Sequence, residues 1–255
     1  MESLEAERER AEALDVSELA DAIETIGFEC TRCGACCKAV EGCESGAEDA
    51  DGDGDDAETG DQSADGDAEG HDHTATVFPD EVRRLQATDD YDWRDVARPM
   101  PYGLVEGDEG LQGETFEWAL QTDDCGDCTF YAEDDDGVGA CTVHGDRPLV
   151  CRTYPFSIKS LSDDSKGGVG TTEPMGGVVD HEGMVRAHEC EGLGRDISRE
   201  DAEELAAALK ERAIRELEEA IGVRDNYEPT DVDGVVVHDS EGQKRPNGTP
   251  LEGGE

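Results

Sequence analysis

The chain has 255 residues and a formal net charge of −46, with 67 acidic side chains against 21 basic ones. Leu, Ile, Val and Phe together make up about 17% of the chain, and such a low fraction is by itself typical of disordered proteins. This charge argues against binding to nucleic acid or to anionic membranes.

The acidic residues are spread along the whole chain, and only five of the basic residues are lysine. This balance is typical of a cytoplasm at molar salt, where the Debye length falls to about 3 Å and self-repulsion is screened. The opening residues lack the basic and apolar regions of a signal peptide. No apolar run is long enough to span a membrane. We therefore expect a halophilic, cytoplasmic protein.

Residues 1–27 are predicted to form an N-terminal helix, frayed over residues 1–10 and capped by Asp15 or Ser17. Its role would be to deliver Phe28 and the first cysteine to the core. Its apolar stripe consists of Leu14, Leu19, Ile23 and Ile26.

Residues 41–73 carry 14 acidic residues and no Lys or Arg, which predicts an acidic disordered insertion. The sequence Asp49-x-Asp51-x-Asp53-Gly54 matches the start of an EF-hand loop. Gly60 stands at the twelfth position in place of the bidentate Glu, so calcium is not expected. We interpret His71 and His73 as exposed side chains and not as ligands.

Beyond the insertion, Pro79 and the acids that follow it predict a short helix. Strand-like pieces follow over 89–122, and Gly137-Val-Gly139 predicts a hairpin-like turn. A capping box at Ser198 predicts a C-terminal helix over 196–224. Residues 225–255 are predicted to be a polar, largely disordered tail.

The expected fold class is α+β, with a small irregular core that is organised by cysteines and metal. Short strands build this core, and the N- and C-terminal helices flank it. We predict a single cysteine-cluster domain made of residues 28–40 and 74–195.

Four cysteines lie within eight residues in the spacing C-x-x-C-x-x-C-C: Cys30, Cys33, Cys36 and Cys37. This is too dense for buried spectator thiols, and a turn at Gly34 would let neighbouring sulfurs converge on a metal. Without an export signal, the spacing favours metal binding over a disulfide scaffold. Residues 30–40 and 141–160 each carry a net charge of +2, which would offset the charge of thiolates.

An ordered set of motifs accompanies this segment: Phe28–Cys37, Val77-x-Pro-x-Glu81-Val-x-x-Leu85, Cys128–Phe130, Cys141, Arg147-Pro148, Cys151-Arg152, Tyr154-Pro155-Phe156 and Cys190-x-Gly-x-Gly194. The set resembles the YkgJ-like cysteine-cluster family (CxxCxxCC) of zinc- or iron-chelating domains, in a halophilic-archaeal form. The resemblance covers most of 28–195. The chain departs from the family at the insertion and at His144, where an aromatic residue is usual.

The resemblance implies eight metal ligands: Cys30, Cys33, Cys36, Cys37, Cys128, Cys141, Cys151 and Cys190. Two cysteines fall outside this set. We interpret Cys43 as a free thiol, and we do not expect Cys125 to act as a substitute ligand. The candidate supporting residues are Arg32, Arg147, Arg152 and Tyr154.

Eight thiols suit two four-ligand sites, or one cluster together with a structural zinc ion. Adjacent side chains usually point apart, so we expect Cys36 and Cys37 to serve different sites unless one of them is not a ligand. The C-x-x-C-x-x-C spacing slightly favours a [4Fe–4S] cluster over zinc. Arg147 and Arg152 would bind a small anion or, as we favour, brace the thiolates.

The expected function is metal binding, with zinc or an iron–sulfur cluster, in electron transfer or metal handling. One alternative is an enzyme of protein modification or maturation, because related cysteine-cluster domains occur in a flagellin lysine methylase. Another is a structural zinc module that docks a protein partner, whose identity the sequence does not indicate. Walker A, H-E-x-x-H, G-x-S-x-G and dinucleotide-binding motifs are missing, so no catalytic residue is assigned and enzymatic activity stays open.

Overall fold

The structure is a computed structural model that describes residues 3–39, 72–107, 110–159, 171, 177–230 and 233–251. Nearly all of the predicted insertion, with Cys43 and His71, lies outside the described residues. None of the helices described is long and apolar enough to cross a membrane.

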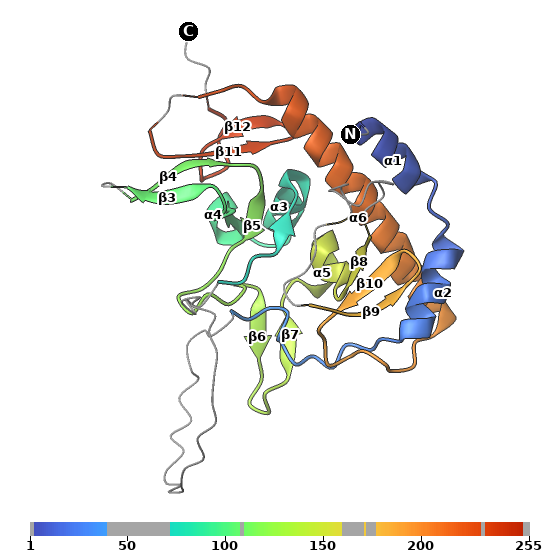
Figure 1. The fold of residues 1–255 in the computed structure, drawn as a ribbon. Helices are drawn as coiled ribbons and strands as arrows, with labels where there is room; N and C mark the ends of the chain where they lie inside the picture. Colours follow the sequence, from blue (N-terminus) through green and yellow to red (C-terminus); the bar gives the residue numbers. More distant parts are fainter. Residues whose placement is uncertain are drawn as a thin grey trace, which may run out of the picture.

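The helices are α1 (Leu4–Glu12), α2 (Val16–Ile26), α3 (Pro79–Gln86), α4 (Trp93–Val96), α5 (Leu149–Thr153) and α6 (Arg199–Asn226), with a 3₁₀ turn at His144–Asp146. The strands are β1 (Thr76–Val77), β2 (Ala97–Pro99), β3 (Leu104–Gly107), β4 (Gly110–Thr115), β5 (Trp118–Leu120), β6 (Tyr131–Glu133), β7 (Gly139–Cys141), β8 (Phe156–Ile158), β9 (Val178–Glu182), β10 (Val185–His188), β11 (Val235–Asp239) and β12 (Gly242–Lys244). Helices at both ends of the chain flank a strand-rich middle, which confirms the α+β class (Figure 1).

The strands form several small sheets. Their orders are β1-β5-β2, β8-β10-β9 and β12-β11-β4-β3, and β6 pairs with β7 as a hairpin. The pairs are antiparallel except for β11 and β4, which run parallel. No single sheet organises the molecule, and the buried side chains accordingly form two clusters.

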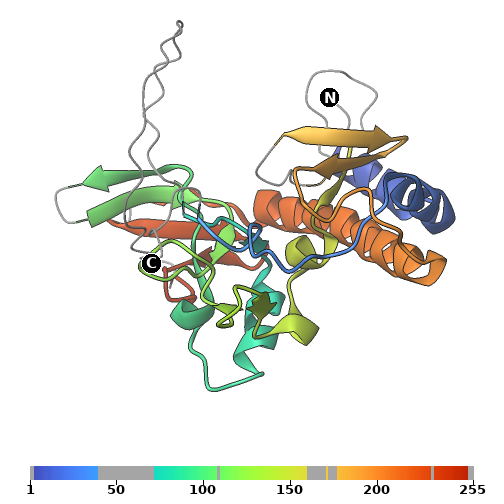
Figure 2. The same ribbon diagram turned by 90° about the horizontal axis from the view of Figure 1, so that it is seen from below.

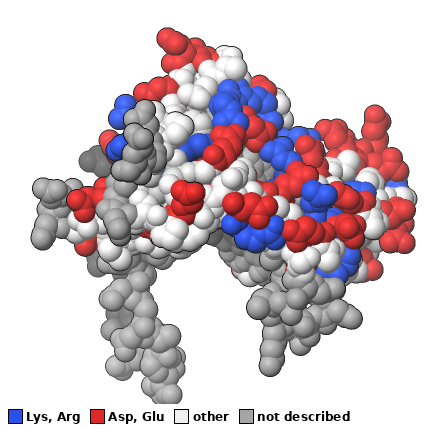
Figure 3. All heavy atoms as spheres, turned by 90° about the horizontal axis from the view of Figure 1, so that it is seen from above, with Lys and Arg blue, Asp and Glu red and all other residues white. Residues whose placement is uncertain are grey.

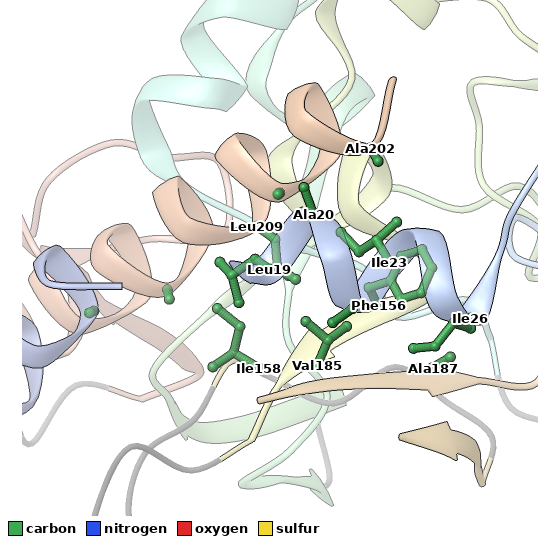
Figure 4. Close-up of a cluster of buried hydrophobic side chains, with 14 of the residues drawn as sticks. Leu19, Ala20, Ile23, Ile26, Phe156, Ile158, Val185, Ala187, Ala202 and Leu209 are labelled. Atoms are coloured by element: carbon green, nitrogen blue, oxygen red, sulfur yellow. The ribbon is translucent and has the colours of Figure 1, made fainter. Parts of the chain in front are cut away.

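The first core lies between α1, α2, α6 and the sheet β8-β10-β9. Asp15 starts α2, where its carboxylate accepts hydrogen bonds from the Ser17 and Glu18 amides, as an N-cap should. The helix then buries one apolar face against the sheet and α6. Figure 4 shows Leu19, Ile23, Phe156, Val185 and Leu209 of this core packed together.

The second core lies under β1-β5-β2, α3 and β11. Trp118 is its largest side chain, and the Trp93 ring meets it edge-on with centroids 5.0 Å apart. Four cysteines belong to this core or pack against it: Cys37, Cys128, Cys141 and Cys151. Helix α6 packs against α1 and α2 and also against β11 and β12, so it links the two cores (Figure 1).

Two terminal segments differ from the prediction. Residues 1–27 form two helices instead of one, because Asp15 caps a new helix just after α1 ends. Residues near the start are not frayed but form α1, which packs on α6 and buries Ala11 completely. In the predicted disordered tail over 225–255, Val236 and Val237 are buried in β11 because that strand pairs with β4 and β12.

Several ion pairs join elements that are distant in sequence. Arg83 of α3 meets Glu241 beside β12, Arg215 of α6 meets Asp80 of α3, and Arg224 meets Glu5 of α1 at 2.7 Å. Figure 3 shows basic side chains lying beside acidic ones on the face that it draws. These three arginines thus connect elements that are distant in sequence.

Candidate metal centre

The first four cysteines lie on a tightly turned segment that follows α2. Arg32 has φ +60° and Gly34 has φ +79°, both in the left-handed region. The Cys37 amide donates a hydrogen bond to the Gly34 carbonyl at 2.7 Å. A Cβ on residue 34 would lie 2.1 Å from the Tyr131 hydroxyl oxygen, so only glycine lets the turn approach β6 this closely.

One side of this segment is held by the chain around Cys190. The Glu29 amide donates to the Gly192 carbonyl at 3.0 Å, and the Gly194 amide donates to the Gly27 carbonyl at 3.0 Å. The Tyr154 hydroxyl donates to the Glu189 carbonyl, next to Cys190. These bonds bring together three thiols, which we call the first thiol group: Cys30, Cys33 and Cys190.

The other side of the segment is held by the β6–β7 hairpin. The Gly139 amide donates to the Arg32 carbonyl at 2.8 Å, and the Cys128 amide donates to the Cys37 carbonyl at 2.8 Å. Cys141 pairs with Tyr131 across the hairpin, and α5 carries Cys151. We call the four cysteines at the second core the second thiol group: Cys37, Cys128, Cys141 and Cys151.

The electrostatics of these thiols follow from burial and mutual proximity. Burial raises the pKa of Cys128 to about 11. Burial also raises the pKa of Cys151 well above its ordinary value, with Cys128, Cys36 and Cys141 adding to the effect. In the first thiol group, burial and then Cys33, Cys36 and Cys30 raise the pKa of Cys190. Without a cation these thiols therefore favour their neutral form, and a bound metal ion would stabilise their thiolates.

Cys36 lies between the two groups. Its thiolate raises the pKa of Cys128, Cys151 and Cys190, so it is close to members of both groups. Its sulfur is 3.8 Å from that of Cys37. Two thiolates on one tetrahedral zinc ion, with Zn–S bonds of about 2.3 Å, are separated by about the same distance. This contact would therefore also suit one shared ion, whereas the sequence led us to expect that Cys36 and Cys37 serve different sites.

The thiols are neighbours without forming a complete coordination shell. Within the described ranges, no three His, Cys, Asp or Glu side chains converge closely enough to hold a metal ion. The donor set nevertheless fits the metals that the sequence suggests, because clustered thiolates favour zinc and iron–sulfur clusters. Among the described residues, the free cysteines are the same eight that were predicted as ligands.

The predicted supporting residues have different positions. Arg147 lies near Cys36 and Cys141, where its charge lowers the pKa of both thiols against the larger raising effects of their surroundings. Arg32 supports the turn through its carbonyl, and Tyr154 anchors the Cys190 loop. Arg152 follows Cys151 on α5 and is half-buried.

Glu81 has a role that the sequence did not indicate. Its side chain is almost fully buried, and one carboxylate oxygen accepts a hydrogen bond from the Leu149 amide at 2.9 Å. The other oxygen accepts from the Phe78 amide at 3.2 Å. Glu81 thereby caps the start of α5 from α3, and it positions the helix that carries Cys151.

Four other cysteine and histidine side chains are not assigned to the thiol groups: Cys125, His188, His181 and His73. Cys125 is disulfide-bonded, which removes it from the metal donors. His188 is buried in β10, and its Nε2 lies 2.7 Å from the Ser157 hydroxyl, so it serves the first core. His181 is exposed on the edge strand β9, and His73 packs near Arg98.

Comparison with known proteins identifies a family for this part of the chain. A family model described as "CxxCxxCC: Putative zinc- or iron-chelating domain" matches residues 29–191, which is more than half of the chain. This range includes all eight predicted ligands. Neither the search of curated proteins nor that of solved structures gives a match.

Proposed function

Because the chain belongs to the family of CxxCxxCC zinc- or iron-chelating domains, we propose that its eight free cysteines hold metal at two neighbouring sites. The metal is zinc or an iron–sulfur cluster, with [4Fe–4S] favoured by the spacing of the first cysteines. The protein would serve in electron transfer or in metal handling. A bound zinc ion would crosslink the chain, and an iron–sulfur cluster would exchange electrons.

The observation that supports this proposal is that backbone hydrogen bonds bring cysteines from four parts of the chain into the same region of the fold. The turned segment after α2 lies between the Cys190 loop on one side and the β6–β7 hairpin with α5 on the other (Figure 2). In our assignment, Cys36 completes the first thiol group, so that each group has four donors. Four thiolates are the usual ligand set of a structural zinc ion or an iron–sulfur cluster.

The first test is metal and sulfide analysis with an absorption spectrum, on protein purified without oxygen in molar KCl. Iron, sulfide and a visible band that bleaches with dithionite would identify an iron–sulfur cluster. Zinc without visible colour would identify thiolate zinc sites. Protein that is folded, free of metal and unable to take up either metal would contradict the proposal.

The assignment of ligands to sites is tested by metal stoichiometry in serine variants. We expect Cys30→Ser and Cys128→Ser each to lose one centre and keep the other. The double variant Cys36→Ser with Cys37→Ser separates the two arrangements of these neighbours. It would lose both centres if the two thiolates serve different sites, and only one if they share an ion.

A further inference from the structure

A cavity of about 720 Å³ lies between α6 and the sheet β1-β5-β2, outside the thiol groups. Its wall is largely apolar, with Met100, Trp118 and Val223 among the lining residues. Cavities of about 300–1,000 Å³ with such walls are typical of small-molecule sites. It contacts α5 through Val150, but no cysteine and neither Arg147 nor Arg152 is among its lining residues. The cavity is therefore not a part of the metal centre.

Exposed aromatic rings distinguish this cavity from an ordinary packing gap. Tyr102, Phe116 and Tyr227 all line it, and they are 69%, 46% and 42% exposed. Phe116 and Tyr227 lie together, with ring centroids 6.0 Å apart. Exposed aromatic side chains at the edge of a hollow are suited to contact the apolar part of a ligand and to bind a cation over a ring face.

The charged groups of the cavity leave a surplus of negative charge. Arg212 is paired with Glu216 at 2.7 Å, and Arg224 is paired with Glu5 and Asp225. Two further carboxylates of the wall determine the sign of the ligand.

Glu117 and Glu219 line the cavity without a cationic partner: among the described residues, no Lys or Arg lies within ion-pair distance of either one. Glu219 accepts hydrogen bonds from Ser240, one of them from its amide at 2.8 Å. Burial raises the pKa of Glu219, and the charge of Lys244 lowers it by a smaller amount. Partial burial, and then the like charges of Glu216 and Glu219, raise the pKa of Glu117. A cationic ligand would relieve this repulsion.

We propose that this cavity binds a small organic cation, an ammonium group attached to an aromatic or branched aliphatic body. The ammonium group lies beside Glu117 and Glu219, and the apolar body contacts Tyr102, Phe116 and Tyr227. The proposal goes beyond metal binding and concerns a separate site. A metal-replete protein can therefore fail this test while the proposed function stands.

The test uses phenethylamine, which is cationic at neutral pH, and 2-phenylethanol, a neutral molecule of nearly the same shape. Both are titrated into the full-length, metal-replete protein at constant KCl concentration. Binding is measured by calorimetry and by tryptophan fluorescence, because Trp118 lines the cavity. We expect the amine to bind at least tenfold more tightly than the alcohol. Equal affinities, or no binding of either compound, would overturn the proposal.

Two variants show whether the charge acts at this site. Glu117→Gln removes the charge and nearly keeps the size and shape of the side chain, so it should remove most of the preference for the amine. Glu211→Gln removes an equal charge from an exposed position of α6 that does not line the cavity, and it should keep the preference. If both variants weaken amine binding equally, or if Glu117→Gln leaves it unchanged, the site assignment is wrong.

Discussion

The turn that carries the first cysteines requires glycine at position 34 for two reasons, its left-handed backbone conformation and its close approach to Tyr131. The residue has φ +79°, and a Cβ would meet the Tyr131 hydroxyl oxygen at 2.1 Å. We expect Gly34→Ala to lower the bound metal and to destabilise the protein by at least the ~1–2 kcal/mol that a left-handed non-glycine residue costs. Metal stoichiometry and urea unfolding measure the two effects.

Gly145→Ala is the matched control for this substitution. A Cβ at residue 145 meets nothing within 4 Å, and the residue has no positive φ. It lies in the 3₁₀ turn near the second thiol group, so it tests whether any glycine change in this region disturbs the metal. A Gly34→Ala protein with full metal content would show that the turn tolerates a side chain.

His73 should make stability depend on pH. Burial, and then the charge of Arg98, lower its pKa to about 4, whereas an unfolded chain protonates histidine at a pH of about 6.5. The unfolded state therefore binds more protons between these values, and the stability that neutral His73 contributes is lost as pH falls from about 6.5 to about 4.

As pH falls through that window, we expect the free energy of unfolding of the wild type to decrease relative to that of His73→Gln. Urea unfolding of both proteins at a series of pH values measures this difference, and the many carboxylates cancel because both proteins carry them. Two parallel stability curves would mean that His73 is not protected in the folded state.

The first four candidate ligands could be proposed from the sequence because their spacing is a local signal. The role of Glu81 could not, because its carboxylate accepts from an amide 68 residues later, and nothing near Glu81 in the sequence indicates that partner. The division of the thiols into two groups could not be predicted either, because it depends on contacts between distant parts of the chain. Cys190 joins Cys30 and Cys33 only through backbone bonds between residues 27–29 and 192–194.

Strands β11 and β12 contribute to the stability of the second core through a buried ion pair and a hydrogen bond. Asp239 accepts a hydrogen bond from the Trp118 indole at 2.8 Å, and it lies 2.7 Å from the Lys244 ammonium group. Asp239 and Lys244 are both buried. Asp239→Ala would leave the buried Lys244 ammonium group without one of its carboxylate partners. We expect the free energy of unfolding to fall by about 3–5 kcal/mol. Urea unfolding followed by tryptophan fluorescence measures this change.

Asp233→Ala provides the control, because Asp233 is exposed just before β11 and should contribute little. Adding Lys244→Met to Asp239→Ala should recover part of the loss, since no uncompensated charge then remains buried. If Asp239→Ala were as stable as Asp233→Ala, the C-terminal strands would contribute as little as a disordered tail.

Strand β11 was missed because its pairing with β4 is not local. Val235–Val237 is a short apolar run inside a polar, Gly-rich segment, and it pairs with Gly113–Thr115 in a parallel register. Parallel partners need no turn sequence between them, so the segment carries no hairpin signal toward β4. The short helix at Pro79 and the hairpin at Gly137 were predictable because their signals lie within a few residues.

Across the whole molecule, the thiol groups lie where the two cores meet. The second thiol group packs on the second core, while the chain bearing Cys30 and Cys190 continues into α2 and β10 of the first core. We expect metal removal by a chelator to lower stability and to uncouple the cores. The metal-replete protein should unfold in one transition and the metal-free protein in two.

The chain contains suitable probes for each core. Both tryptophans, Trp93 and Trp118, belong to the second core or pack against it, whereas α1 and α2 pack in the first core and contribute to far-ultraviolet circular dichroism. After chelation, fluorescence and circular dichroism should therefore report different unfolding midpoints. Coincident midpoints with and without metal would show that α6 and the backbone pairing suffice to couple the cores.

The pairing of residues 27–29 with residues 192–194 also affects how the protein is made. Cys30 leaves the ribosome 160 residues before Cys190, so at about 5–20 residues per second it waits on the order of ten seconds or more for this partner. In the ligand assignment that we propose, Cys30 and Cys33 would thus form an incomplete site during synthesis, which can meet oxidants or an unsuitable metal. The order of biosynthesis favours metal loading after translation of residue 190, when the last thiol closes the first group.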